Sequence, residues 1–254
     1  AVSDEEEERA TRLLKNEFAL RDRLHDGWAI RPVASTQYRG RFALVYAPFC
    51  FELLACRAGK AISGIARFIE MAIRICGPLR QMHQHNLIHG DIKPGAIFVH
   101  HDATCRLCSF GLSCGTSDAF SQSRLAASGG TPAYMSPEHT TRTRRAVDSR
   151  SDLYSLGIVL YELLTGRLPF ELSADDQTNW AHYHIASEPL APGRVRPDVP
   201  GMLSTIILKL LEKNPENRYQ TVDGLIADLR RCQATLTAEG EIVDFIPGQQ
   251  DRSP

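Results

Sequence analysis

The feature that most constrains the fold is the order of five short patterns in the middle of the chain. They are a helical apolar pattern at residues 62–83, the polar segment HGDIKP at 89–94, two strand-like runs at 97–99 and 106–108, and SFG at 109–111. The helix would end just before the polar segment and carry it as a loop. The two short runs bracket residues 100–104 and are expected to form two short strands. This order would place Ser109 beside Asp91.

Three further motifs follow in the second half of the chain: GTPAYMSPE at 130–138, DLYSLG at 152–157 and NPENRY at 214–219. Together with HGDIKP they resemble the C-terminal lobe of Ser/Thr protein kinases, over residues from about 49 to 232. The resemblance implies an α+β, protein-kinase-like fold with a mainly helical C-terminal lobe (C-lobe) and a truncated, β-containing N-terminal lobe (N-lobe). Residues 1–48 are then expected to form the partial N-lobe, residues 49–235 the C-lobe, and residues 236–254 a linker tail.

The resemblance implies catalytic roles for three residues of the polar segments. In this family a loop Asp accepts the proton of the substrate hydroxyl, and ATP with Mg²⁺ supplies the phosphoryl group. Asp91 stands at the position of this base, Lys93 at that of the Lys that steadies the transferred phosphate, and Thr131 at that of the residue that shapes the substrate-hydroxyl site. A protein substrate is the implied partner. Alternatively, Asp91 is kept only as an acid that caps its loop.

Three residues depart from the family pattern. Ala96 stands where an Asn, and Ser109 where the Asp of the D-F-G motif, would each bind Mg²⁺. Gly90 replaces the Arg that meets a phosphorylated activation segment. Because Ala96 and Ser109 supply neither a carboxylate nor an amide, we expect no metal held by the protein and impaired binding of ATP and Mg²⁺.

The N-terminal part is expected to form a helix followed by two strands. Apolar residues recur at helical spacing over residues 9–24, with Glu17 in the apolar stripe, and strand-like runs follow at 29–38 and 41–47. In kinases the acid at the place of Glu17 pairs with a strand Lys that holds the nucleotide phosphates. Neither this Lys nor a G-x-G-x-x-G loop precedes the helix in this sequence. Alternatively, Glu17 is only an acid at the edge of the stripe.

Two other groups of residues have both a structural and a chemical interpretation. His89 is expected to be a buried packing and hydrogen-bonding residue and not a reacting group. Cys105 and Cys108, with Cys114 downstream and His100 and His101 just upstream, raise the alternative of a zinc site. Residues three apart on a strand point to opposite faces, so we expect the two thiols not to share an ion.

Composition narrows the classes of partner and location. The net charge of −1 and the lack of a Lys/Arg block argue against a nucleic-acid partner. The longest apolar run, near residues 156–164, is shorter than the ~20 residues of a bilayer span, and no signal peptide is visible. Seven cysteines, an odd number, fit thiols in a reducing compartment, so a cytoplasmic location is expected. The chain begins with Ala1, which suggests that residues precede it.

A narrower resemblance rests on residues 148–154, residues 180–185 and the tail FIPGQQD at 245–251. These are similar to bacterial hybrid proteins that join a Ser/Thr kinase domain to an ATPase module and a sensor histidine kinase of a two-component system. One function is then an impaired kinase-like domain, a pseudokinase, that regulates or docks partner domains of a larger signalling protein. The other is an active Ser/Thr kinase whose glycine loop and Lys lie upstream. The kinase resemblance also implies a Glu138–Arg218 ion pair and a contact of Asp152 with the catalytic loop.

Overall fold

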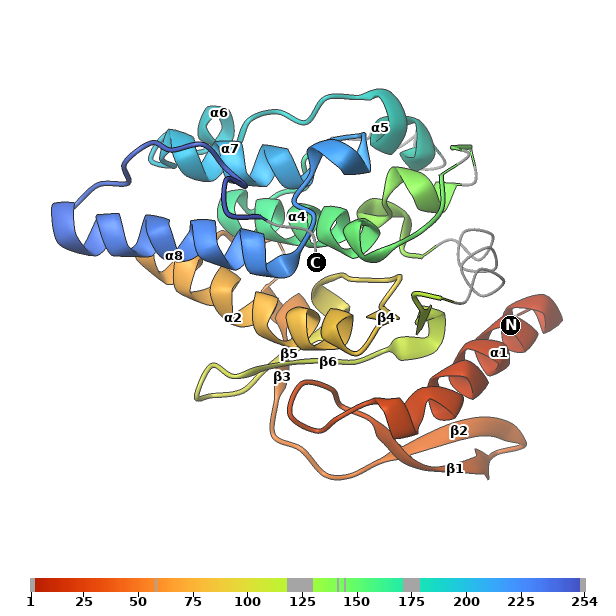
Figure 1. Ribbon diagram of the computed structural model, residues 1–254. Helices are drawn as coiled ribbons and strands as arrows, with labels where there is room; N and C mark the ends of the chain where they lie inside the picture. Colours follow the sequence, from red (N-terminus) through yellow and green to blue (C-terminus); the bar gives the residue numbers. More distant parts are fainter. Residues whose placement is uncertain are drawn as a thin grey trace.

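The computed structural model of the protein describes residues 3–57, 59–117, 130–140, 142–143, 145–170 and 179–251. Its helices are α1 (Asp4–Leu20), α2 (Ile65–Gln84), α4 (Ser149–Thr165), α5 (Trp180–Ala186), α6 (Pro192–Val195), α7 (Gly201–Leu210) and α8 (Val222–Glu239). Its strands are β1 (Pro32–Tyr38), β2 (Arg41–Tyr46), β3 (Glu52–Leu53), β4 (Leu87–Ile88), β5 (Ile97–Val99), β6 (Cys105–Leu107) and β7 (Cys114–Gly115). Figure 1 shows a mainly helical body, with α1 and the β1–β2 hairpin at one side. This is the α+β arrangement that the sequence predicted.

Helix α1 begins before the predicted start at residue 9, because the acidic run upstream forms its first turn. Ser3 Oγ accepts a hydrogen bond from Glu6 N at 3.3 Å, and the Glu6 carboxylate accepts one from Ser3 N at 3.0 Å. This is a capping box, and acids in the first turn are favoured next to the positive end of the helix dipole. The helix ends at Leu20, and a 3-10 turn over Arg21–Arg23 completes the segment.

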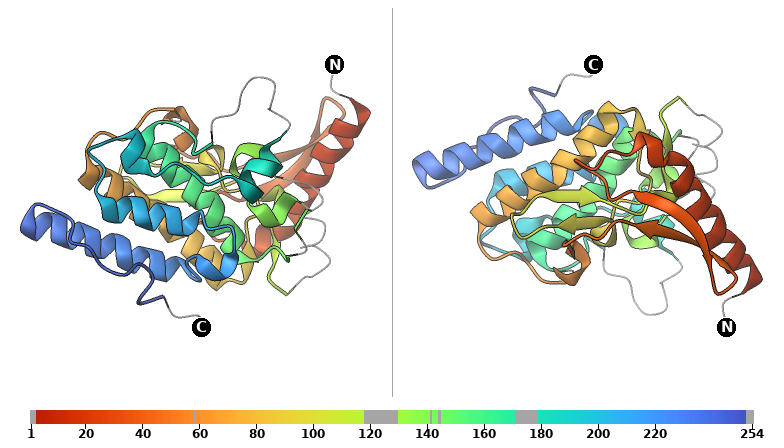
Figure 2. Two further views of the ribbon diagram at one scale, coloured as in Figure 1. Left: turned by 90° about the horizontal axis from the view of Figure 1, so that it is seen from above. Right: turned by 90° about the horizontal axis from the view of Figure 1, so that it is seen from below.

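A turn at Arg39 and Gly40, between the two predicted strands, joins β1 to β2. Both residues have positive φ, 51° and 77°, which is the geometry of a tight two-residue hairpin. Strand β1 starts later than predicted, because Ala29 instead forms a parallel bridge with Leu107 of β6. Figure 2 shows the hairpin beside α1 and next to the helical body. The bridge at Ala29 thus fastens the N-terminal part to that body.

Helix α4 lies inside the helical body, and its side chains are buried from Ser151 to Leu164. A helix that is apolar on nearly all sides is stable only when other elements cover it. Helices α2 and α7 contact α4, and α8 lies along α2. Gly157 allows the close approach of α7, since a Cβ there would lie 2.7 Å from the Cβ of Leu210.

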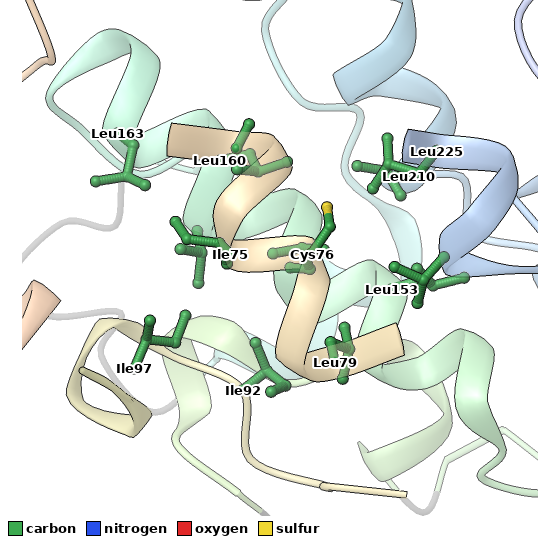
Figure 3. Close-up of a cluster of buried hydrophobic side chains, with 14 of the residues drawn as sticks. Ile75, Cys76, Leu79, Ile92, Ile97, Leu153, Leu160, Leu163, Leu210 and Leu225 are labelled. Carbon is green, nitrogen blue, oxygen red and sulfur yellow. The ribbon is translucent and has the colours of Figure 1, made fainter. Parts of the chain in front are cut away.

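The core between these helices also anchors the polar loop. Figure 3 labels Ile75, Cys76 and Leu79 of α2, Leu153, Leu160 and Leu163 of α4, and Ile92, Ile97, Leu210 and Leu225. Ile92 and Ile97 flank the loop that carries Lys93, and both are buried in this cluster. Full burial of such a side chain stabilises a fold by about 1.5–3 kcal/mol. The loop is therefore held on both sides by the core.

Two small sheets bring the polar segments together. Strands β3, β5 and β6 form one sheet, and β4 and β7 form the other. The two predicted short strands are present as β5 and β6, and the structure shows that they pair, with Ile97 opposite Leu107. Ile88 of β4 pairs with Cys114 of β7. Because β4 leads into the HGDIKP loop and β7 follows SFG, this pairing holds the two segments side by side.

The C-terminal segment differs from the predicted linker. Helix α8 runs to Glu239 and ends at Gly240 with φ 79°, so the predicted boundary at residue 236 lies inside the helix. The apolar periodicity of α8 extends to Leu236, which packs on the core. Beyond the helix, Phe245 also packs on the core, and Asp251 accepts hydrogen bonds from backbone groups at the start of α8. The tail folds back on the helical body before it ends.

Across the residues that the structure describes, no helix has both the length and the apolar character needed to cross a membrane.

Candidate functional site

Asp91, Lys93 and Thr131 form one closed group of polar contacts. Lys93 Nζ donates to Asp91 Oδ2, and it also donates to Thr131 Oγ1 at 2.6 Å. The backbone N–H of Thr131 donates to Asp91 Oδ1 at 2.7 Å. The three candidate catalytic residues of the sequence are thus brought together, although 38 to 40 residues separate Thr131 from the loop.

Gly130 makes this contact possible. A Cβ at residue 130 would lie 2.9 Å from Asp91 Oδ1 and 3.2 Å from the carbonyl oxygen of Gly90. Gly90 itself has a φ of 78°, a backbone conformation that favours glycine. The glycine at the position of the family's Arg therefore also suits the local backbone of the loop.

Asp152 of α4 holds the backbone of the HGDIKP loop in place. Its carboxylate accepts hydrogen bonds from His89 N at 2.8 Å and Gly90 N at 2.9 Å, and contacts His83 Nε2 at 2.9 Å. Burial raises the pKa of Asp152, but these partners outweigh burial and leave the pKa below its ordinary value. His83 lies near the end of α2, so Asp152 ties the loop to that helix, as the resemblance implied.

His89 is a structural residue of the loop, as predicted. Its Nδ1 accepts a hydrogen bond from Asp91 N at 3.2 Å, so Nε2 carries the proton and donates to Cys108 O at 3.0 Å. Burial lowers its pKa and favours this uncharged form. The His89 ring also contacts the ring of Phe110, with centroids 5.4 Å apart. His89 therefore contacts the residues on both sides of Ser109.

Ser109 lies beside the loop, as the strand order predicted, but in an unusual backbone conformation. Its φ is 66° and its ψ is 54°, in the left-handed region where Asn and Asp are several-fold enriched among residues other than Gly. Its side chain is exposed, and its Oγ lies 3.6 Å from Cys108 Sγ. The backbone would suit an Asp at least as well as the Ser that is present.

Ala96 is hydrogen-bonded to the residue that precedes Ser109. It is fully buried, and its carbonyl oxygen accepts a hydrogen bond from Cys108 N at 3.0 Å. The two family positions for metal ligands are therefore adjacent in space, yet one carries a methyl group and the other a hydroxyl.

Glu17 of α1 is buried, with 4% of its surface exposed, and it joins three segments. It accepts a hydrogen bond from Tyr46 Oη of β2 at 2.8 Å and one from the backbone N–H of Phe110. Burial raises its pKa, although both hydrogen bonds act in the opposite direction. Within the described residues its side-chain partner is therefore a tyrosine, where the family has a lysine. Tyr46 was not identified from the sequence.

The protein kinase domain model matches residues 49–228 of the chain. The chain belongs to the protein kinase family. The serine/threonine-protein kinase PknB of Mycolicibacterium smegmatis is 41% identical over 166 residues, which cover 65% of this chain and 26% of PknB. PknB of Mycobacterium tuberculosis is 39% identical over 166 residues, which again cover 65% of this chain and 26% of that protein. A probable serine/threonine-protein kinase of Streptomyces coelicolor is 36% identical over 167 residues, 65% of this chain and 24% of that protein. The chain thus spans about a quarter of the length of these relatives.

Among the described residues, the two positions that bind Mg²⁺ in the family, Ala96 and Ser109, supply neither a carboxylate nor an amide. Mg²⁺ takes a near-ideal octahedral shell, usually of one or two protein carboxylates completed by substrate phosphates and waters. No group of three or more His, Cys, Asp or Glu within the described ranges could hold a metal. The carboxylate of Asp91 is already bound by Lys93 and by the backbone of Thr131.

The two cysteines of the zinc alternative lie in separate environments. Cys105 Sγ contacts the carbonyl oxygen of Ala103, and Cys108 Sγ that of Gly95. Burial raises the pKa of Cys105 to about 12 and that of Cys108 to about 11. Both side chains are therefore thiols at neutral pH, whereas zinc binds thiolates.

The implied ion pair between Glu138 and Arg218 is confirmed. Arg218 Nη2 lies 2.8 Å from Glu138 Oε1, and both side chains are buried, with 0% and 1% exposed. Glu138 belongs to the motif that begins at Gly130, and Arg218 to the segment just before α8. We call residues 130–138 the Thr131 segment. The ion pair therefore fixes the end of the Thr131 segment to the helical body.

Proposed function

We propose that this chain is a Ser/Thr kinase-like signalling domain that transfers phosphate poorly, a pseudokinase, and that it acts as a regulatory or docking module. The observation that carries the proposal is the pair of neighbouring positions Ala96 and Ser109. They stand where the family has its metal ligands, and they offer no carboxylate and no amide. Phosphoryl transfer depends mostly on positioning and on neutralising charge. Without those ligands the charge on bound phosphates would be neutralised chiefly by Lys93.

Lys93 is itself poorly placed for that task. Its ammonium group contacts the Asp91 carboxylate, which balances its charge locally, and it also binds Thr131. A nucleotide phosphate would have to compete with both partners. Glu17, which would position a phosphate-binding Lys in the family, is bound to Tyr46 instead. The contacts among Asp91, Lys93 and Thr131 are therefore better suited to holding the Thr131 segment in place than to receiving ATP and Mg²⁺.

The docking role is supported by the parts of the fold that remain intact. Asp152, His89 and the Glu138–Arg218 pair hold the loop and the Thr131 segment in one arrangement through contacts within the chain itself. We propose that this C-lobe presents a fixed surface to a protein partner or to partner domains of a larger bacterial, cytoplasmic signalling protein. The resemblance of residues 245–251 to hybrid kinase, ATPase and sensor proteins supports that setting.

The experiment is an ATP titration of the purified chain, with and without Mg²⁺, followed by a phosphate-transfer assay on a Ser/Thr protein substrate. We expect no tightening by Mg²⁺ and no transfer above background. Ser109→Asp alone should not restore activity, because Ala96 still lacks a ligand. A deficit of ~5.5 kcal/mol in transition-state stabilisation corresponds to about 10⁴-fold in rate. Transfer that needs Mg²⁺ and disappears in Asp91→Asn would refute the proposal.

A signalling assay in cells tests the docking role separately. Asp91→Asn should leave the output unchanged, because the proposed role needs no base. Leu160→Asp should abolish the output, because it places a charge in the buried core around α4. An output that is lost in Asp91→Asn, with the protein still folded, would favour catalysis over docking.

The second candidate is an active Ser/Thr kinase. The contacts among Asp91, Lys93 and Thr131 favour it, since all three candidate catalytic residues are present and adjacent. This proposal requires a glycine-rich loop and a Lys from residues upstream of Ala1. A longer form that binds Mg-ATP, and loses binding when that Lys is replaced, would support the second candidate over the first.

A further inference from the structure

The tail that follows α8 is bound to the helical body at two carboxylates. Asp251 Oδ1 accepts hydrogen bonds from Thr221 N at 3.1 Å and from Thr221 Oγ1 at 2.7 Å, and Asp251 Oδ2 accepts one from Gln220 N. At the second point Gly248 N donates to Asp228 Oδ2 at 2.6 Å. Asp228 is a buried residue of α8, and the same oxygen accepts a hydrogen bond from Tyr219 Oη at 2.6 Å.

Two glycines make room for these contacts. A Cβ at Gly224 would lie 2.4 Å from the carboxyl carbon of Asp251, which is closer than real Cβ contacts allow. Gly248 has a φ of 79°, and a Cβ there would lie 2.8 Å from the Lys209 side chain. Glycine is a poorer helix former than alanine, by about 1 kcal/mol in a helix interior. The docked Asp251 gives a physical reason for glycine at position 224.

Apolar contacts support the docked tail along its length. Ile242 and Phe245 pack against the core, and the guanidinium of Arg231 lies 4.4 Å from the centre of the Phe245 ring. Of the contacting residues, Phe245, Gly248 and Asp251 belong to the segment FIPGQQD. We call residues 240–251 the strap.

The strap binds close to the Glu138–Arg218 ion pair, which holds the Thr131 segment in place. Residues 218–221 run from Arg218, which pairs with Glu138, to Thr221, which caps α8 and is bound by Asp251. The side chain of Gln220 lies between them: it donates to Arg218 O at 2.9 Å and accepts from Arg150 Nη1 at 2.9 Å. One short segment is therefore fastened to the strap on one side and to Glu138 on the other.

We propose that the strap is a conformational device that couples the C-terminal end of the chain to the Thr131 segment. Docked, it fixes residues 218–221 and, through Arg218, the Glu138 end of that segment. When the strap is released, residues 218–221 and the Glu138 end of the Thr131 segment both become more mobile. This coupling does not depend on phosphate transfer, so it holds whether the domain is a pseudokinase or an active kinase.

Hydrogen exchange on the full chain tests the coupling. In Asp251→Ala we expect exchange at least about tenfold faster at residues 218–225, because hydrogen bonds to a charged acceptor are lost. Exchange should also rise at residues 136–140, around Glu138. The matched control is Asp244→Ala, which removes the same charge from an exposed position of the strap; its exchange should equal that of the wild type.

A second variant separates release of the strap from damage to α8. Gly224→Ala removes no hydrogen-bonding group and adds a good helix former, so α8 alone would become more protected. If the strap matters, the added Cβ displaces Asp251 and exchange rises as in Asp251→Ala. Slower exchange in Gly224→Ala would overturn the proposal. So would a rise in Asp251→Ala that is confined to residues 218–225, since the coupling to Glu138 would then be absent.

Discussion

Replacing Arg218 is expected to destabilise the protein more than replacing Glu138, although the two form one ion pair. Besides its contact with Glu138, the guanidinium donates to three backbone carbonyl oxygens, those of Glu212 at 2.7 Å, Arg150 at 3.1 Å and Lys213 at 3.2 Å. Neither carboxylate oxygen of Glu138 accepts a well-aligned hydrogen bond from the described residues. Arg218 thus satisfies three carbonyl groups and pairs with one carboxylate, and Glu138 contributes mainly its charge.

The expected loss in the free energy of unfolding depends on which buried groups each variant leaves without a partner. Removing one partner of a buried ion pair costs about 3–5 kcal/mol in the free energy of unfolding. Arg218→Met leaves a buried carboxylate and three unpaired carbonyls, so its cost should lie at or above ~5 kcal/mol. Glu138→Gln leaves the guanidinium with its three carbonyls, so its cost should lie near ~3 kcal/mol. These are large fractions of the roughly 5–15 kcal/mol that stabilises a typical domain.

Urea unfolding of the full chain measures both costs. The control is Arg230→Met, which removes an exposed arginine from α8 and should change the free energy by no more than about 0.5 kcal/mol. An Arg218→Met variant as stable as this control would mean that the ion pair contributes nothing. A Glu138→Gln variant less stable than Arg218→Met would refute the reasoning from the three carbonyls.

Three other measurements address separate parts of the molecule. Tyr46→Phe leaves the buried Glu17 without its side-chain donor and should cost about 1–3 kcal/mol by urea unfolding, whereas Tyr38→Phe, at an exposed tyrosine, should cost almost nothing. Burial lowers the pKa of His184 to about 4 in the folded state, whereas its pKa in the unfolded state is about 6.5. At pH values between these two, the unfolded state therefore binds more protons than the folded state. The free energy of unfolding should therefore fall by about 2 kcal/mol more from pH 7 to pH 5 than in a His184→Asn variant; an equal fall would contradict this. Amides of the two-stranded β1–β2 sheet should exchange much faster than those of α4, because an isolated hairpin with an unpaired edge is marginally stable; equal protection would count against that view.

The C-lobe could be predicted closely because its motifs are local and ordered. The two short strands β5 and β6 could be placed from the order of the segments, whereas the role of Asp152 and the Glu138–Arg218 pair came from the family resemblance. The catalytic roles of Asp91, Lys93 and Thr131 stay predictions, although the three residues are in contact. The division into residues 1–48, 49–235 and 236–254 is likewise a prediction, apart from the helix boundary at Glu239.

The parts that the sequence did not predict depend on contacts between distant segments. The Tyr46 hydroxyl finds Glu17 only when β2 packs beside α1, and no periodicity signals this. Asp251 reaches the start of α8 because Gly224 has no side chain, and a lone glycine in a helical pattern does not by itself indicate which segment packs against it. The early start of α1 was, by contrast, available in the sequence, since Ser3 and Glu6 have the spacing of a capping box.

The backbone at Ser109 has a consequence for how easily the chemistry of this site could change. The left-handed conformation there is fixed by its neighbours, through the bond from Cys108 to Ala96 on one side and the contact of Phe110 with His89 on the other. Such a conformation is tolerated better by Asp than by Ser. A carboxylate at this position would need no rearrangement of the chain. The obstacle to regaining a metal ligand at Ser109 is therefore one side chain and not the architecture, whereas at Ala96 the surrounding core must also make space.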